Sequence, residues 1–197
     1  MKPPVTLQKT LAKFAAVASL GAATLTSGCS RAVRLPEYGR VPAFTLTAQD
    51  GNNFDSNSIK GKIWLADFIF TSCPGPCPRM TSRMHQVQQA IPDAADVRFV
   101  SFTVDPEHDT PKQLSTYAAA FHAPPEQWFF LTGPQQELDH LGFDVFKLNH
   151  VDSAFMHSTR FVLIDRRSTI RQYYDTGESK LISRIVADIR RLEREAR

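Results

Sequence analysis

Cysteine is scarce in this sequence, which has three in 197 residues, at positions 29, 73 and 77. A second pair of closely spaced cysteines is missing, so the four-ligand site that zinc usually takes from two such pairs is incomplete. The sequence also has no internal repeat and no low-complexity tract. With this length and 42% hydrophobic residues, it predicts a globular protein with one main domain.

Acidic residues are missing from the start of the chain before Glu37, where five basic residues occur: Lys2, Lys9, Lys13, Arg31 and Arg34. The whole chain has 23 Lys and Arg residues and 20 Asp and Glu residues, so removal of the three lysines in residues 1–28 leaves a formal net charge of zero. A basic stripe with interleaved aromatic residues is also absent. The sequence therefore excludes nucleic acid as a partner.

Residues 1–28 predict an export signal or a membrane anchor. A basic start precedes the apolar segment FAAVASLGAATL at 14–25. The apolar region of a signal peptide has about 7–15 residues, whereas a helix that spans a bilayer needs roughly 20. The segment therefore fits an export signal better than a retained anchor.

The segment TSGC at 26–29 resembles the site where bacterial lipoproteins are cut and lipidated on cysteine. Leu25 departs from that pattern, because it lies one position further from Cys29 than the usual leucine. We expect a lipid on Cys29, with cleavage without lipid as the alternative. The protein is then extracytoplasmic, on the periplasmic face of the cell membrane, with residues 29–41 as a tether and residues 42–197 as the folded domain.

Strand and helix patterns alternate along the rest of the chain. Alternating apolar and polar residues around Asp50-Gly51 predict a hairpin over 43–54. Further strands are expected at 62–70, 97–104, 127–133, 159–165 and 169–175, and helices at 78–91, 110–122, 134–143 and 178–195. This order predicts an α/β three-layer sandwich with a mixed central β-sheet and an N-terminal hairpin extension.

The segment FIFTSCPGPCPRM at 68–80 holds two cysteines four positions apart and three prolines. Each proline restricts the residue before it, so Cys73, Gly75 and Cys77 are expected to avoid the α conformation and the helix to begin near Pro78. Both sulfurs then lie between a strand and a helix amino terminus, where we expect lowered thiol pKa values. A structural disulfide is the alternative, but it would close a loop too short to stabilise the fold much.

The C-x-x-x-C spacing is one residue wider than the C-x-x-C of thioredoxin-type oxidoreductases and leaves room for a metal between the sulfurs. Two thiolates suit Cu(I), and one imidazole would complete a three-ligand set. His157, in the loop before the strand expected near Thr159, is the candidate, and a loop histidine without function is the alternative. Met80 and Met84 lie on the apolar stripe of the helix, so we expect them in the core.

Three segments resemble the Sco/SenC family of copper-handling proteins: FIFTSCPGPCP (68–78), VSFTVDPEHDTP (100–111) and HSTRFVLID (157–165). With their flanking strands they cover most of residues 40–195, in the order of the family. The first segment, combined with a histidine about 80 residues later, is quite specific. The resemblance implies a thioredoxin-like fold.

The resemblance also implies that Cys73, Cys77 and His157 bind one copper ion, Cu(I) or Cu(II), per monomer. It suggests that the chain is a metallochaperone for the Cu(A) centre of cytochrome c oxidase, with oxidase subunit II as the partner and an N-terminal anchor on the membrane surface. The protein that supplies the copper is not indicated. We expect a monomer.

Two other functions stay open for the same cysteine pair. An extracytoplasmic thiol–disulfide oxidoreductase would use Cys73 and Cys77 as catalytic residues to reduce the cysteines of oxidase subunit II. A peroxidase of the thioredoxin-like group would reduce peroxide through a sulfenate. The chain lacks the usual single-cysteine arrangement of such peroxidases, and the spacing and His157 favour the copper chaperone.

The second segment holds two carboxylates that resemble family positions near the site. Asp109 and Thr110 are interpreted as helix-capping residues, and Asp105 as a group that supports the ligands or is only structural. Between the cysteines, Gly75 and Pro76 replace the acidic and aliphatic residues often found in the family. This departure leaves the ligands unchanged and bears more on partner docking.

Overall fold

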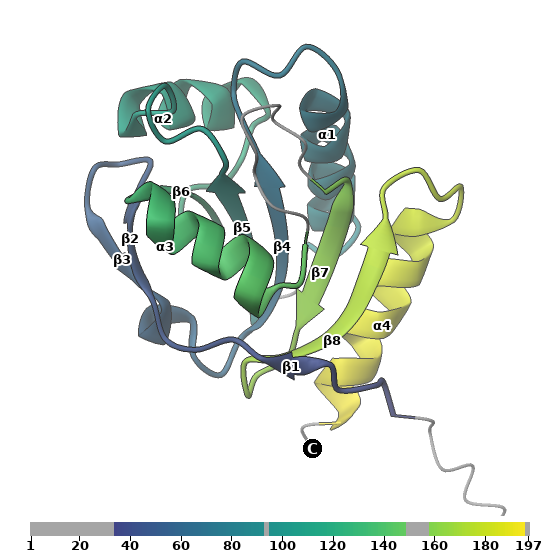
Figure 1. The fold of residues 1–197 in the computed structure, drawn as a ribbon. Coiled ribbons are helices and arrows are strands. Elements are labelled where there is room, and N and C mark those ends of the chain that lie inside the picture. Colours follow the sequence, from purple (N-terminus) through teal and green to yellow (C-terminus); the bar gives the residue numbers. More distant parts are fainter. Residues whose placement is uncertain (1–33, 93–94, 149–157, 196–197) are drawn as a thin grey trace, which may run out of the picture. The chain divides into compact units, whose positions relative to one another are not determined.

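The computed structural model describes residues 34–92, 95–148 and 158–195 of the chain (Figure 1). Its strands are β1 (Gly39–Arg40), β2 (Thr45–Ala48), β3 (Asn53–Asp55), β4 (Ile63–Ile69), β5 (Val97–Thr103), β6 (Trp128–Thr132), β7 (Arg160–Ile164) and β8 (Thr169–Asp175). Its helices are α1 (Pro76–Gln89), α2 (Pro111–Ala120), α3 (Gln135–Asp139) and α4 (Leu181–Glu195). A 3-10 turn covers Ser56–Ile59, and a π turn, His140–Val145, extends α3. The part of the chain from Val33 onward is a compact unit with its own hydrophobic core.

The strands form one mixed sheet in the order β1-β8-β7-β4-β5-β6-β2-β3. β4, β5 and β6 are parallel, and the remaining neighbours are antiparallel. All seven residues of β4 are buried, as expected for a central strand that is covered on both faces. The pairing of β2 with β3 confirms the expected N-terminal hairpin.

Helices cover both faces of the sheet, so the expected three-layer α/β sandwich is confirmed (Figure 1). On one face α1 packs against α4, and the Tyr117 hydroxyl of α2 lies 2.9 Å from Thr81 Oγ1 of α1. On the other face, where α3 lies, the ring of Phe68 on β4 packs against the rings of Phe102 and Phe146. The alternation of side chains along β4 thus separates an aromatic layer from the helical layer that carries α1.

Helix α1 begins at Pro76, two residues earlier than the proline pattern predicts. The expectation that Cys77 avoids the α conformation was therefore wrong. The first turn of a helix needs no backbone N–H bonds, so Pro76 and Pro78 remove none there, and a proline at the first position is favoured. In this helix the first-turn position outweighs the restriction that Pro78 places on the preceding residue.

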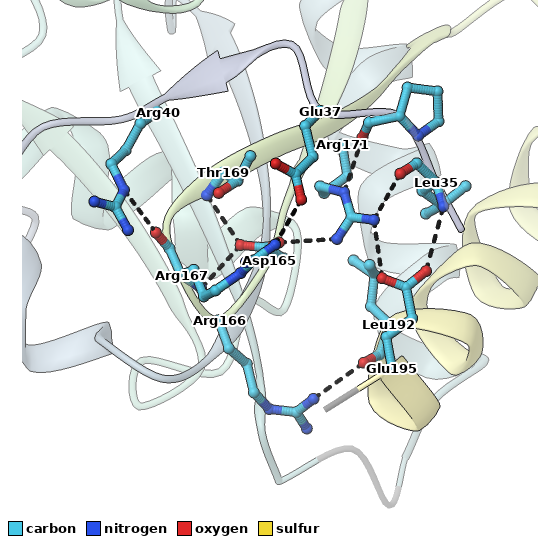
Figure 2. A network of polar contacts seen from close by, with 11 residues as sticks. Leu35, Glu37, Arg40, Asp165, Arg166, Arg167, Thr169, Arg171, Leu192 and Glu195 are labelled. Atoms are coloured by element: carbon cyan, nitrogen blue, oxygen red, sulfur yellow. Dashed lines mark hydrogen bonds and ion pairs between the residues drawn. The ribbon is translucent and has the colours of Figure 1, made fainter. Parts of the chain in front are cut away.

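The segment from Arg34 to Val41, assigned to the tether in the sequence, contacts the sheet. Leu35 and Val41 are buried, and β1 pairs with β8. Arg171 of β8 holds this segment by donating to the carbonyl oxygens of Leu35 (2.7 Å) and Pro36 (2.8 Å) (Figure 2). Across the described ranges, no helix is long and apolar enough to cross a membrane.

Candidate metal centre

The two thiols lie where β4 passes into α1, as the sequence predicts. Cys73 is in the loop between these elements and Cys77 is in the first turn of the helix, and both are buried. Neither cysteine forms a disulfide, so the structural-disulfide alternative finds no support here. The paired sulfurs are thus available as metal ligands or as a redox pair.

The start of α1 directs a backbone donor at one of the sulfurs. Gly75 is the N-cap residue and has no side chain to accept a hydrogen bond from the first turn. The backbone N–H of Cys77 instead donates to Cys73 Sγ at 3.5 Å. The sulfur of Cys73 therefore accepts a hydrogen bond from the first turn in place of a capping side chain.

The second thiol has the opposite environment. Cys77 has no exposed surface, and burial raises its pKa far above the ordinary value, with a smaller opposing effect from a hydrogen bond to the Phe70 backbone. Cys73 and Asp67 raise it further. The expectation of lowered thiol pKa values was therefore wrong for Cys77, because desolvation outweighs the favourable position at a helix amino terminus.

The loop that carries Cys73 is held by a buried carboxylate. Asp109 accepts hydrogen bonds from the backbone N–H (3.1 Å) and hydroxyl of Thr71 and from the hydroxyl of Thr103 at the end of β5. Thr110, not Asp109, caps α2, since its side chain accepts from the N–H of Gln113. The interpretation of Thr110 as a cap is confirmed, and that of Asp109 is corrected, because it fastens the end of β5 to the loop of the thiols.

Asp105 is also buried and bonds to a neighbouring imidazole. Its carboxylate lies 2.8 Å from His108 Nδ1, and this contact is the main cause of the raised pKa of the exposed His108. The backbone N–H of Asp105 donates to Thr103 Oγ1. The carboxylate is thus committed to a histidine three residues away, which favours its structural interpretation.

Asp67 is the only charged residue within β4, and it is fully buried. Neither of its carboxylate oxygens has a hydrogen-bond partner among the residues described. Burial raises the pKa of Asp67 to about 7, and Ser101 on β5 opposes the shift with a smaller effect. Asp67 contributes in turn to the raised pKa values of Cys77 and Tyr117, so it lies within electrostatic range of both. The sequence analysis missed this group, although its charge inside an apolar run was a signal.

The raised pKa of Asp67 predicts how stability depends on pH. Between pH ~4 and ~7 the folded chain keeps a proton that the unfolded chain releases, so the unfolding free energy falls as pH rises through this window, by at most about 4 kcal/mol. Asp67→Asn removes this decline. In urea unfolding of the reduced, copper-free chain, we expect the variant to gain stability relative to the wild type between pH ~5 and ~8.

The exposed Asp96 supplies the control for this comparison. Lys62 donates to it at 2.7 Å and lowers its pKa, so Asp96 is ionised in the folded and unfolded chain throughout this window, and Asp96→Asn should leave the pH dependence between pH ~5 and ~8 unchanged. Comparing two pH values also cancels any constant cost of a buried amide at position 67. Parallel pH profiles for the wild type and Asp67→Asn would contradict the assignment.

The remaining residues singled out in the sequence, the lipid site Cys29 and the other possible ligands, divide into two groups. His157 and Cys29 lie outside the described residues, so their predicted roles stay predictions. Met80 and Met84 are buried in α1 as part of the hydrophobic core, which confirms their expected place. Within the described ranges, no cluster of three or more His, Cys, Asp or Glu side chains is positioned to hold a metal ion. The structure thus provides two sulfurs, and a third ligand would come from elsewhere.

Comparison with known proteins identifies the family. The family model described as SCO1/SenC matches residues 36–194. This range includes Cys73, Cys77 and His157 and all three segments that carry the resemblance. The chain belongs to the SCO1/SenC family. The resemblance inferred from the three sequence segments is therefore confirmed, and so is the thioredoxin-like fold.

Three solved structures illustrate the relationship. A SCO1/SenC family lipoprotein from Bacillus anthracis is 32% identical, with a TM-score of 0.74 over 79% of this chain and 95% of its own. BsSco, described as a member of the Sco family of cytochrome c oxidase assembly proteins with a disulfide switch, is 36% identical, with a TM-score of 0.73 over 81% and 96%. ScoI from Bradyrhizobium japonicum with copper bound is 26% identical, with a TM-score of 0.65 over 79% and 99%.

Proposed function

We propose that this SCO1/SenC protein carries one copper ion on Cys73, Cys77 and His157 and delivers it to cytochrome c oxidase, at the Cu(A) centre of subunit II. The observation that carries the proposal is the pair of buried, reduced thiols between β4 and α1. The copper-bound ScoI and the description of BsSco support the cargo and the process. Thiolate sulfur is a soft ligand that suits Cu(I), and an imidazole suits either copper state.

The described residues can prepare this site before the ion arrives. The Asp109 contacts fix the loop of Cys73, and helix α1 fixes Cys77, so little conformational freedom is lost on binding. The N–H of Cys77 also donates to the sulfur of Cys73 and so helps to fix its position. Burial excludes water from the sulfurs, which also protects a bound Cu(I) ion from competing ligands.

The role of His157 is tested by anaerobic Cu(I) titration of fragment 30–197 with a competing chromophoric ligand. We expect one ion per wild-type chain, and a drop in affinity of at least about tenfold for His157→Ala, because one of three ligands is lost. His140→Ala is the matched control, since His140 lies on the surface of the α3 extension and pairs with Asp144. If His157→Ala retains the wild-type affinity and spectrum, the third ligand is assigned incorrectly.

Thiol–disulfide reduction of the subunit II cysteines is the second candidate. The different environments of the two thiols favour it, since Cys73 receives a backbone N–H and the buried Cys77 has a raised pKa, a division suited to an attacking and a resolving thiol. Turnover of a model disulfide by the copper-free fragment tests it. Rates like those of thioredoxin would favour reduction over copper transfer.

We further propose that residues 1–28 are an export signal, that Cys29 carries the lipid, and that the domain acts as a monomer on the periplasmic face of the membrane. The lipoprotein description of the Bacillus anthracis relative supports the lipid. Mass spectrometry of the chain purified from membranes tests this, because a diacylglyceryl group on Cys29 adds a mass that a Cys29→Ala chain lacks.

A further inference from the structure

The thiols and the N-terminal segment lie at opposite ends of the sheet. β4 leads toward Cys73 at its carboxyl end, and β7 runs antiparallel to it, with Ile164 opposite Trp64. The β7–β8 turn at Arg166 and Arg167 therefore lies beside the beginning of β4, about 20 Å from the thiol end by the length of the strand. The segment that starts at Arg34 is held at this same end by the contacts in Figure 2.

This end of the domain, which we call the basal face, is rich in basic residues from separate parts of the chain. They are Arg34, Arg40, Lys60, Lys62, Arg98, Arg166, Arg167 and Arg171. The acidic residues among them are fewer: Glu37, Asp55, Asp96, Glu126, Asp165 and Glu195. Two of these, Asp165 and Glu195, are bound to the buried guanidinium of Arg171. The exposed part of the basal face therefore carries a surplus of positive charge.

The surplus is local. From residue 29 onward the chain has equal numbers of basic and acidic residues, so a positive basal face leaves a negative excess elsewhere. Arg34, Arg40, Lys60 and Arg167 are all exposed. Within the described ranges, the side chains of Arg34 and Lys60 form no hydrogen bond or ion pair, whereas Arg167 forms an ion pair with Glu37.

The basal face is also hollowed between its basic groups. A cavity of about 400 Å³ is lined by Arg40, Lys60, Arg166 and Arg167, together with apolar residues and the polar residues Ser56, Asn57 and Ser168. A second hollow of about 260 Å³ lies beside it, lined by Arg34, Arg166, Arg167 and Arg171 together with Asp165 and Glu195, whose carboxylates are paired with Arg171. Guanidinium groups around a concave surface can contact phosphate oxygens with two hydrogen bonds each.

We propose that the basal face docks on anionic phospholipid headgroups of the membrane. The position of the chain's N-terminal segment selects this partner, since Cys29 is five positions before Arg34 and even a fully extended connection reaches only about 18 Å. With a lipid on Cys29, the basal face stays close to the bilayer surface, where each basic residue adds about fivefold to the affinity for anionic lipids. This orientation rests on the proposed lipid anchor, whereas the charge on the basal face does not.

Docking through the basal face would fix the orientation of the thiols relative to the membrane. A domain docked by its basal face holds its thiols at the far end of the sheet, away from the membrane. A partner site that projects from the membrane can then reach Cys73 and Cys77 without rotation of the carrier. Docking through the thiol end would instead cover the ligands.

Vesicle sedimentation of fragment 30–197, which lacks the lipid-bearing cysteine, tests the proposal. We expect binding to vesicles of phosphatidylcholine with about one-third phosphatidylglycerol at low salt, release at high salt, and little binding to phosphatidylcholine alone. Arg34→Glu with Lys60→Glu should weaken binding by at least about tenfold. The matched control reverses two exposed lysines at the thiol end, Lys112→Glu with Lys180→Glu, with the same change in net charge, and should retain the affinity.

Three results would overturn the proposal: no binding to anionic vesicles at low salt, equal binding to neutral vesicles, or equal losses for the two double variants. Thermal unfolding of each variant checks that the fold is intact. Cu(I) titration separates this proposal from the copper site, because Arg34→Glu with Lys60→Glu should leave copper affinity unchanged. If copper binding fails and vesicle binding holds, the proposed function is wrong and the docking surface stands.

Discussion

Cys77→Ser is expected to lower the Cu(I) affinity of fragment 30–197 by far more than the ~100-fold that loss of a group supporting a ligand can cost. A hydroxyl is a poor ligand for this soft ion, and the site would retain a single sulfur. Cys73→Ser should have a comparable effect. Competition titration under anaerobic conditions measures both, with His140→Ala as the control and urea unfolding as the check of the fold.

The raised pKa of Cys77 adds a signature to this result. The thiol must lose its proton when copper binds, so wild-type affinity should rise with pH, by about tenfold per pH unit for each proton released. Cys77→Ser removes one of these protons and should flatten the dependence. A serine variant that binds Cu(I) as tightly as the wild type, or with the same pH slope, would show that the cysteine pair is not the site.

Arg171→Met is expected to reduce the unfolding free energy by about 3–5 kcal/mol, the range for loss of one partner of a buried ion pair. The Arg171 side chain is 3% exposed and its guanidinium lies 2.9 Å from both Asp165 and Glu195, so its removal takes the nearest cation from two poorly solvated carboxylates and leaves only Arg167, 3.7 Å from Asp165. It also removes the donors for the carbonyl groups of Leu35 and Pro36 (Figure 2). Urea unfolding at neutral pH measures the effect.

Arg167→Ala is the control for the loss of an arginine from the same end of the sheet. Arg167 forms a 2.6 Å ion pair with Glu37, but the two side chains are 63% and 56% exposed, so we expect a loss below about 1 kcal/mol. Adding Asp165→Asn and Glu195→Gln to Arg171→Met should restore part of its stability. A single Arg171 variant as stable as the Arg167 variant would mean that the network in Figure 2 contributes little.

The order of strands and helices was predictable because each element carries its own pattern. The buried run of β4, the stripe of Met80 and Met84 in α1, and the cap at Thr110 are local features, and the structure contains all three. The start of α1 was predicted less well, since the proline rules for Cys77 and for a first helical turn conflict. The position within the helix decided between them.

The cysteine pair could be found from the sequence because spacing and proline content are local. Three other groups could not, since their roles depend on distant parts of the chain. Asp109 reaches back 38 positions to Thr71, and Arg171 joins the N-terminal segment to the end of α4. Asp67 is buried only because helices cover both faces of its strand.

The sequence by itself determined the family, the alternation of strands and helices, and the thiol pair between β4 and α1, because each of these is written in neighbouring residues. Only the tertiary structure decided the electrostatics. Folding buries Cys77 and raises the pKa of its thiol, although its position at a helix amino terminus would by itself lower it. Folding also brings basic residues from four separate segments together at the opposite end of the sheet. Burial and long-range proximity exist only once the chain is folded, and they determine the free energy of ionising a side chain.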